Sequence, residues 1–187
     1  MSALSSVPPI GLTLFGLFIG LLSAVAAAFA LWWVALGLFI GNRILDGLDG
    51  DVARAARKES DAGGYADITA DMVVYAAIPI GASIGSDIDN IWIFTSFLVA
   101  SFYINTITWS YLAAIIEKQA AQGLKTTSIV FPPGLVEGTE TVLFYAAMLV
   151  LPQWLDWIMA AMAIAVILGA ITRFTAAQVQ LRRGYKT

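Results

Sequence analysis

Long apolar segments separated by short polar turns run through most of the chain. The first of them extends from Ile10 to Ile40 with few interruptions. As a single helix it would be roughly 46 Å long, whereas the hydrocarbon core of a bilayer is about 30 Å thick. The chain is therefore expected to turn back near Trp32 and Trp33, whose side chains suit the membrane interface.

The same pattern continues along the chain and predicts an all-α bundle of six transmembrane helices. Polar turns separate the later segments, the clearest of them at residues 85–90, and a longer loop is expected at residues 118–134. Because no long polar region is left over, the 187 residues are expected to form one membrane domain, residues 1–187. The expected helices cover residues 10–29, 32–57, 64–81, 91–117, 137–151 and 154–181.

The basic residues predict how the bundle is oriented. No Lys or Arg precedes Arg43, so the first segment lacks the cationic start of a secretory signal and is expected to be a retained span. Most other cations follow the second, fourth and sixth spans, and such residues favour the cytoplasmic side. We therefore expect an integral protein of the bacterial inner (cytoplasmic) membrane with both termini and the active site facing the cytoplasm. These cations are Arg57, Lys58, Lys118, Lys125, Arg182, Arg183 and Lys186.

Composition narrows the possible chemistry. The chain is 59% hydrophobic and 12% charged, and it contains no cysteine and no histidine. Disulfides, thiolate chemistry and imidazole ligands are thereby excluded, so any catalysis has to use carboxylates, hydroxyls, Lys or Arg. The small net charge of −3 and the dispersed cations give no support to nucleic-acid binding.

Four aspartates, Asp46, Asp49, Asp67 and Asp71, interrupt this apolar background. A carboxylate at membrane depth is costly unless a cation or a water-filled cavity compensates it. Helical spacing places the first two on one face of the second helix and the last two on one face of the third. Asp51 falls about 140° from Asp46 around the helix and is not expected to be a ligand. An all-oxygen site favours Mg²⁺ or Mn²⁺ first and Ca²⁺ second.

Small residues and an arginine beside the aspartates suit a phosphate ligand. Gly50 and Ala53 leave room for a ligand to approach the backbone. Arg54 carries a permanent charge that suits a phosphate. The loop before the third helix is expected to end at residues 63–64, with a cap at residues 60–61.

The spacing within this segment is specific. The sequence reads DGLDGDVAR from Asp46 to Arg54, then eight residues, then GGYADITAD from Gly63 to Asp71. It resembles the CDP-alcohol phosphotransferase (CDP-alcohol phosphatidyltransferase) family, whose signature DxxDGxxAR(x8)GxxxDxxxD it matches at all eight fixed positions.

The resemblance implies a transferase of phospholipid biosynthesis. Such enzymes move a phosphatidyl group from a CDP-linked donor, usually CDP-diacylglycerol, to an alcohol acceptor and release CMP. The resemblance also implies a homodimer, two divalent cations (Mg²⁺ or Mn²⁺) on the pyrophosphate of the donor, and Asp71 as the base that deprotonates the acceptor hydroxyl. The implied metal ligands are Asp46, Asp49, Asp67 and Asp71, and the implied nucleotide pocket contains Gly50, Ala53, Arg54 and Gly63.

Other interpretations of the aspartates remain open. The aspartates could form a structural ion-pair network with Arg43, Arg54 and Arg57. They could also belong to an intramembrane prenyltransferase or mark the path of a non-enzymatic cation transporter. Six spans, the position of Arg54 and the basic cytoplasmic rim favour the CDP-alcohol transferase over both.

The signature does not specify the acceptor. Glycerol 3-phosphate, serine, inositol phosphate or another alcohol would suit the same donor site, and so would the reverse pairing of a small CDP-alcohol with diacylglycerol. Arg173 near the end of the sixth span either contacts an acceptor phosphate or neutralises Glu140. Glu137 and Glu140 open the fifth span, and their roles stay open at this point.

Overall fold

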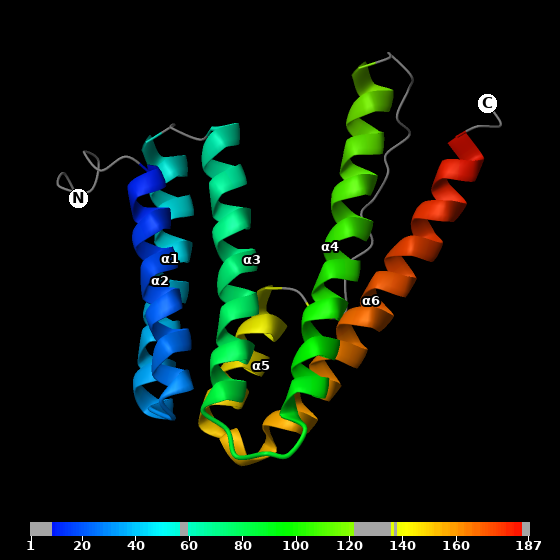
Figure 1. The fold of residues 1–187 in the computed structure, drawn as a ribbon. Helices are drawn as coiled ribbons and strands as arrows, with labels where there is room; N and C mark the ends of the chain where they lie inside the picture. The colour runs from blue at the N-terminus through cyan, green and yellow to red at the C-terminus, as the bar shows by residue number, and fades with distance from the viewer. Residues whose placement is uncertain (1–8, 57–59, 122–135, 137, 185–187) are drawn as a thin grey trace.

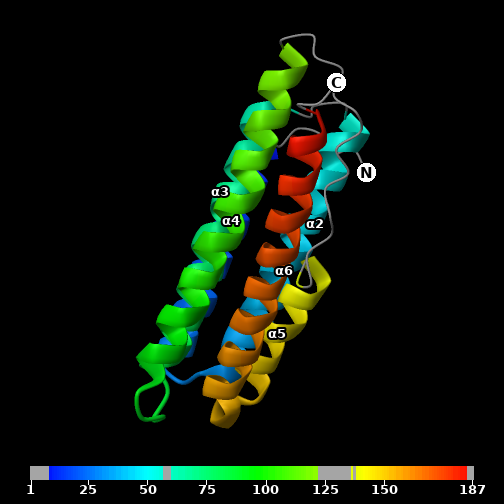
Figure 2. The same ribbon diagram turned by 90° about the vertical axis from the view of Figure 1, so that its right-hand side faces the viewer.

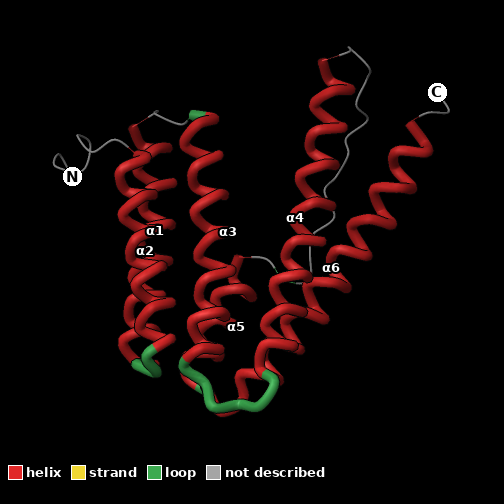
Figure 3. Tube along the Cα trace, in the orientation of Figure 1, coloured by secondary structure: helices red, strands yellow, loops and turns green. Residues whose placement is uncertain are grey.

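The structure, a computed structural model, describes residues 9–56, 60–121, 136 and 138–184, and side chains for residues 10–48, 60–121, 136 and 138–182. In this part of the chain all regular structure is helical (Figure 3), which confirms the predicted all-α class with six α-helices. One short 3-10 helix precedes the last of them. The elements are α1 (Pro9–Ala28), α2 (Trp32–Ala56), α3 (Asp61–Ile84), α4 (Ile91–Ala121), α5 (Gly138–Val150), η2 (Pro152–Trp154) and α6 (Leu155–Gly184).

Within the described residues, four helical segments are long and apolar enough to cross a membrane: α1, α3, α4, and α6 together with η2. By contrast, α2 is 25 residues long but carries the charged residues of the signature in its second half. Helix α5 has only 13 residues, which corresponds to about 20 Å. Crossing of the bilayer by α2 and α5, and the cytoplasmic location of both termini, therefore stay predictions.

The helix ends follow local sequence signals. The chain reverses between α1 and α2 at Ala30, whose φ of 56° lies in the left-handed region, close to the expected turn. Helix α3 begins at Asp61, three residues before the expected start at Gly64. The reason is that Ser60 caps the helix, its hydroxyl accepting a hydrogen bond from the Gly63 N–H at 3.1 Å. Both glycines therefore lie in the first turn of α3 and not in the loop, where we had expected them.

The helices form two groups with α5 between them (Figure 1). Helix α1 packs extensively against α2 and α3, and α4 packs against α6, whereas α3 and α4 contact each other much less. Helix α5 contacts α2, α3 and α6, and Figure 2 shows it beside α6. Toward one end of the bundle, α4 and α6 lean away from α3 (Figure 1).

That end of the bundle carries the signature. The end of α2 and the start of α3 lie there, together with the start of α1 and the end of α6 (Figure 1). Because residues 46–71 run from the second half of α2 into the first half of α3, their acidic residues lie near the same end. The arrangement is the one expected of a bundle with an even number of crossings.

The contact between α1 and α3 depends on glycine. A side chain at Gly81 would collide with the backbone of Ala24, and a side chain at Gly85 would collide with the backbone of Ala27. Both alanines are buried. Such close backbone approach is typical of helix pairs in membranes, where packing has to replace the hydrophobic driving force. It holds the second half of α3 against the second half of α1.

Replacing Gly81 with Ala should lower the melting temperature of the detergent-purified protein, because the added methyl group would force α1 and α3 apart. Overpacking of this kind costs about 1–3 kcal/mol. Gly37→Ala is the matched control, since a methyl group added at Gly37 of α2 would meet no atom of another helix within 4 Å. Equal melting temperatures for the two variants would contradict the close approach of α1 and α3.

Candidate active site

Three of the four predicted aspartates have described side chains, and all three face one pocket. Asp46 comes from the second half of α2, and Asp67 and Asp71 come from successive turns of α3. The pocket is partly open to the outside. Helix α1 supplies its apolar wall. The lining residues are Leu12, Thr13, Gly16, Leu17, Asn42, Asp46, Asp67, Ala70, Asp71 and Val74.

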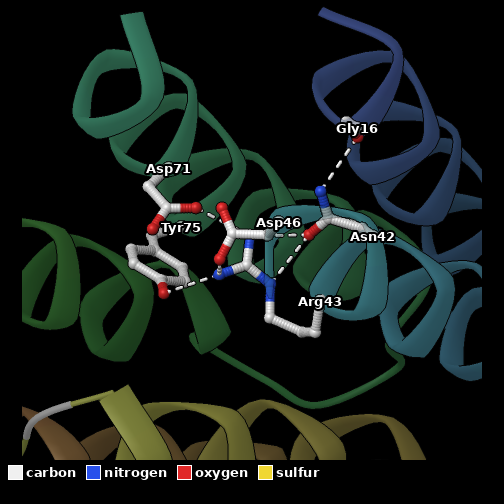
Figure 4. A network of polar contacts seen from close by, with 6 residues as sticks. All are labelled: Gly16, Asn42, Arg43, Asp46, Asp71 and Tyr75. Atoms are coloured by element: carbon white, nitrogen blue, oxygen red, sulfur yellow. Dashed lines mark hydrogen bonds and ion pairs between the residues drawn. The ribbon is translucent and has the colours of Figure 1, made fainter. Parts of the chain in front are cut away.

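An arginine lies among these carboxylates (Figure 4). The Nη2 atom of Arg43 donates to Oδ1 of Asp71 at 2.7 Å, and its Nη1 atom lies 3.5 Å from Oδ2 of Asp46. The carboxyl of Asp46 is also in side-chain contact with that of Asp67. The side chain of Arg43 is 12% exposed, compared with 31% for Asp46 and 25% for Asp71. The cation is therefore less exposed than either of the two carboxylates that it contacts.

Neutral groups hold this guanidinium from the other side. Its Nε and Nη2 atoms donate to Oδ1 of Asn42 at 2.9 and 2.7 Å, and Nη1 donates to the hydroxyl of Tyr75 at 2.9 Å. Asn42 is itself fixed, because its Nδ2 atom donates to the carbonyl of Gly16 on α1 at 2.9 Å (Figure 4). Three helices thus position the charge of Arg43.

Aromatic rings enclose the same guanidinium. Its central carbon lies 5.2 Å from the ring centre of Tyr75 and 5.9 Å from that of Phe39, within the range of a cation–π contact. The fully buried Tyr145 of α5 stacks on Phe39 and donates its hydroxyl to the carbonyl of Tyr75 at 2.5 Å. Through Tyr145, α5 supports the side of the site that faces away from α1.

The sequence pattern places Arg43 only in the alternative ion-pair network and does not predict the roles of Asn42, Tyr75 or Tyr145. One signal was present, because adjacent polar residues such as Asn42 and Arg43 are rare within an apolar helix and need partners there. Which partners they have depends on tertiary packing, and the periodicity of the chain does not contain that information.

The donor set fits a hard divalent cation, since carboxylate oxygens from two helices face one pocket without a soft ligand. Among the side chains that the structure describes, no three carboxylates are arranged so that they could hold a metal ion. Asp49, the fourth predicted ligand, has its side chain outside that part. The described geometry is that of carboxylates held by an arginine, and the assignment of four metal ligands stays a prediction.

The predicted nucleotide pocket falls mostly outside the described side chains. This applies to Gly50, Ala53 and Arg54, and also to Asp51, although α2 continues through all four positions. The N–H of Gly63 donates to the capping hydroxyl of Ser60.

A second buried arginine lies in the other group of helices. Arg173 of α6 is 7% exposed, and its Nη1 atom donates to Oδ1 of Asn105 on α4 at 2.7 Å. Its Nε atom is buried without a hydrogen-bond partner among the residues described. Glu140 is exposed in the first turn of α5, and Glu137 lies outside the described residues. The described partner of Arg173 is therefore Asn105, and a contact with an acceptor or with Glu140 stays a prediction.

Comparison with known proteins agrees with the sequence signature. A family model described as CDP-alcohol phosphatidyltransferase matches residues 7–171. The chain is 35% identical over 150 residues to the inner membrane protein YnjF of Escherichia coli K12. The aligned region covers 79% of this chain and 72% of that protein.

Solved structures share the fold. One is the phosphatidylinositol phosphate synthase PgsA1 of Mycobacterium tuberculosis with CDP-DAG bound, with a TM-score of 0.66, 19% identity, and coverage of 92% of this chain and 87% of that chain. Another is PgsA1 in complex with manganese and citrate, with a TM-score of 0.66, 18% identity, and coverage of 92% and 83%. Because the family model matches most of this chain, the chain belongs to the CDP-alcohol phosphatidyltransferase family.

Proposed function

We propose that the protein transfers a phosphatidyl group from CDP-diacylglycerol to an alcohol and releases CMP, with divalent cations at the site. The observation that carries the proposal is the convergence of Asp46, Asp67 and Asp71 on one pocket, at the signature positions of a chain that belongs to this family. The PgsA1 structures with CDP-DAG and with manganese support the same donor and the same class of ion.

The chemistry is a substitution at phosphorus. The acceptor hydroxyl oxygen forms a bond to the phosphorus of the phosphatidyl group, and the bond from this phosphorus to the bridging oxygen breaks. The electron pair of the broken bond leaves with CMP. The hydroxyl proton goes to Asp71, whose carboxylate works by being placed within hydrogen-bonding reach.

The carboxylates of Asp46, Asp49, Asp67 and Asp71 would hold the cations. When held there, divalent cations would supply positive charge that neutralises the pyrophosphate and offsets the charge on the leaving CMP. Two carboxyl groups in contact, such as those of Asp46 and Asp67, are stable only when a proton or a cation offsets their repulsion. Gly50, Ala53, Arg54 and Gly63 are proposed to line the nucleotide pocket.

The membrane setting completes the proposal. Long apolar helices and the name of the Escherichia coli relative support an integral inner-membrane protein. We propose that residues 1–187 form one domain, that the chain is a homodimer and that the signature end faces the cytoplasm. A CDP headgroup would then enter from water while the acyl chains of the donor stay in the inner leaflet.

The proposed reaction can be tested by CMP release from CDP-diacylglycerol by the purified protein in detergent. CMP should form only when Mn²⁺ or Mg²⁺ and an acceptor alcohol are both present, and EDTA should abolish it. A panel of alcohols with radiolabelled donor identifies the acceptor, and CDP-alcohols with diacylglycerol test the reverse pairing. Failure of every donor and alcohol pair in the presence of metal would contradict the transferase assignment.

Asp67→Asn should reduce turnover at least about a hundredfold, because it removes one charge from the proposed cation site. Asp49→Asn should have the same effect. Asp61→Asn is the control on the same helix, because Asp61 is exposed in the first turn of α3 and is not one of the fixed positions of the signature. Initial rates at saturating Mn²⁺ measure the effect, and full activity of the Asp67 variant would refute its assignment as a ligand.

We further propose that Arg173 contacts a phosphate on the acceptor, since its buried Nε donor is unused in the described structure. Arg173→Gln should raise the KM for the acceptor at least about tenfold and leave the KM for the donor unchanged. Asn105→Ala removes only the partner of Arg173 and should have a smaller effect. If the KM for the acceptor and the KM for the donor both stay unchanged in Arg173→Gln while its melting temperature falls, Arg173 has a packing role instead.

A further inference from the structure

We infer that Arg43 is the resident counter-ion of the proposed cation site, holding Asp46 and Asp71 while the site is metal-free and releasing Asp71 to a divalent cation. The inference rests on the proposed function and adds to it a positioning residue outside the signature. Arg43 lies three residues before the first signature aspartate.

The acidic residues of the metal-free site need a compensating positive charge. Asp46, Asp67 and Asp71 face one pocket near one end of a membrane bundle, where unpaired carboxylates are unstable. Arg43 contacts two of these carboxylates, at 2.7 and 3.5 Å, and is nearly buried. In the metal-free site, its guanidinium therefore supplies positive charge at the carboxylates that a divalent cation would bind.

The contacts of Arg43 with Asp71 and with Asp46 differ in strength. The pair with Asp71 is a short charge-assisted hydrogen bond, whereas the 3.5 Å separation from Asp46 is only an ion-pair distance. The cation binding that the proposed function requires at Asp71 must compete with this hydrogen bond. Arg43 therefore opposes cation binding chiefly through the carboxylate that is also the proposed base.

The guanidinium of Arg43 stays in place when Asp71 is released. Asn42 accepts from two of its nitrogens and Tyr75 accepts from a third, and none of these bonds involves a carboxylate. Asn42 is anchored on Gly16, and Tyr75 is held by Tyr145 through its carbonyl. Release of Asp71 thus costs the guanidinium one hydrogen bond, and the positive charge remains beside the site.

Two opposite effects follow for a neutral substitution. Arg43→Gln should lower the stability of the metal-free protein, because the carboxylates lose their counter-ion. The same change should raise the affinity for Mn²⁺ about tenfold or more, since a fixed like charge next to the ion is removed. A residue that only supports packing would instead weaken both properties when it is replaced.

The test uses the full chain in detergent, purified in Mn²⁺ so that the variant survives isolation, and then stripped with EDTA. Mn²⁺ affinity is measured by isothermal titration calorimetry, and the melting temperature is recorded with and without Mn²⁺. We expect Arg43→Gln to have a lower melting temperature than the wild type without metal. Adding Mn²⁺ should raise its melting temperature by more than it raises that of the wild type, and the variant should bind Mn²⁺ more tightly. Arg43→Lys, which keeps the charge, should bind Mn²⁺ within about threefold of the wild type.

Arg173→Gln is the matched control, because it removes a buried arginine from the other group of helices. It should lower the melting temperature and leave Mn²⁺ affinity unchanged. Equal or weaker Mn²⁺ binding by Arg43→Gln, with binding by the wild type intact, would overturn the inference and leave the proposed function standing. Absence of Mn²⁺ binding by the wild type and the variant alike would overturn the cation site of the proposed function itself.

Discussion

Carboxylates placed on membrane helices need a compensating positive charge, and the signature end of the bundle is organised around that requirement. Arg43 meets it by contacting Asp71 at 2.7 Å and Asp46 at 3.5 Å. A guanidinium is suited to this position because it is permanently charged, planar and able to stack on aromatic rings while donating in several directions. The guanidinium of Arg43 lies over the rings of Phe39 and Tyr75 and donates a hydrogen bond to the oxygen of Asn42. One charge therefore connects the chemistry of α2 and α3 with the packing around them.

The packing of α1 makes this arrangement possible. Its backbone approaches α3 closely at Gly81 and accepts a hydrogen bond from Asn42 of α2 through the carbonyl of Gly16. Helix α1 carries no acidic or basic residue, yet it determines how the two acidic helices face each other. In a membrane protein such contacts rely on shape and hydrogen bonding, because lipid offers apolar side chains an equally good environment.

The sequence predicted most of the helices because their apolar lengths exceed or match the thickness of a bilayer, and it predicted the cap of α3 because Ser60 precedes a helical segment. It also predicted that Asp46, Asp67 and Asp71 face one site, since helical spacing determines which residues share a face. The start of α3 was misplaced because two glycines were interpreted as loop residues. Tyr75 and Tyr145 could not be assigned, because their roles depend on how α3 and α5 pack and not on the order of residues within either helix.

The two groups of helices suggest how one donor mechanism can serve different acceptors. On the proposed function, α1, α2 and α3 hold the nucleotide and the cations, and their mutual packing is extensive. Arg173, the candidate acceptor contact, belongs to the pair formed by α4 and α6, which makes few contacts with α3. A substitution on α4 or α6 can then change the acceptor pocket without disturbing Arg43 or the aspartates. Acceptor specificity in such an architecture depends on side chains that the signature does not include, and this is why the signature alone identifies the reaction but not the alcohol.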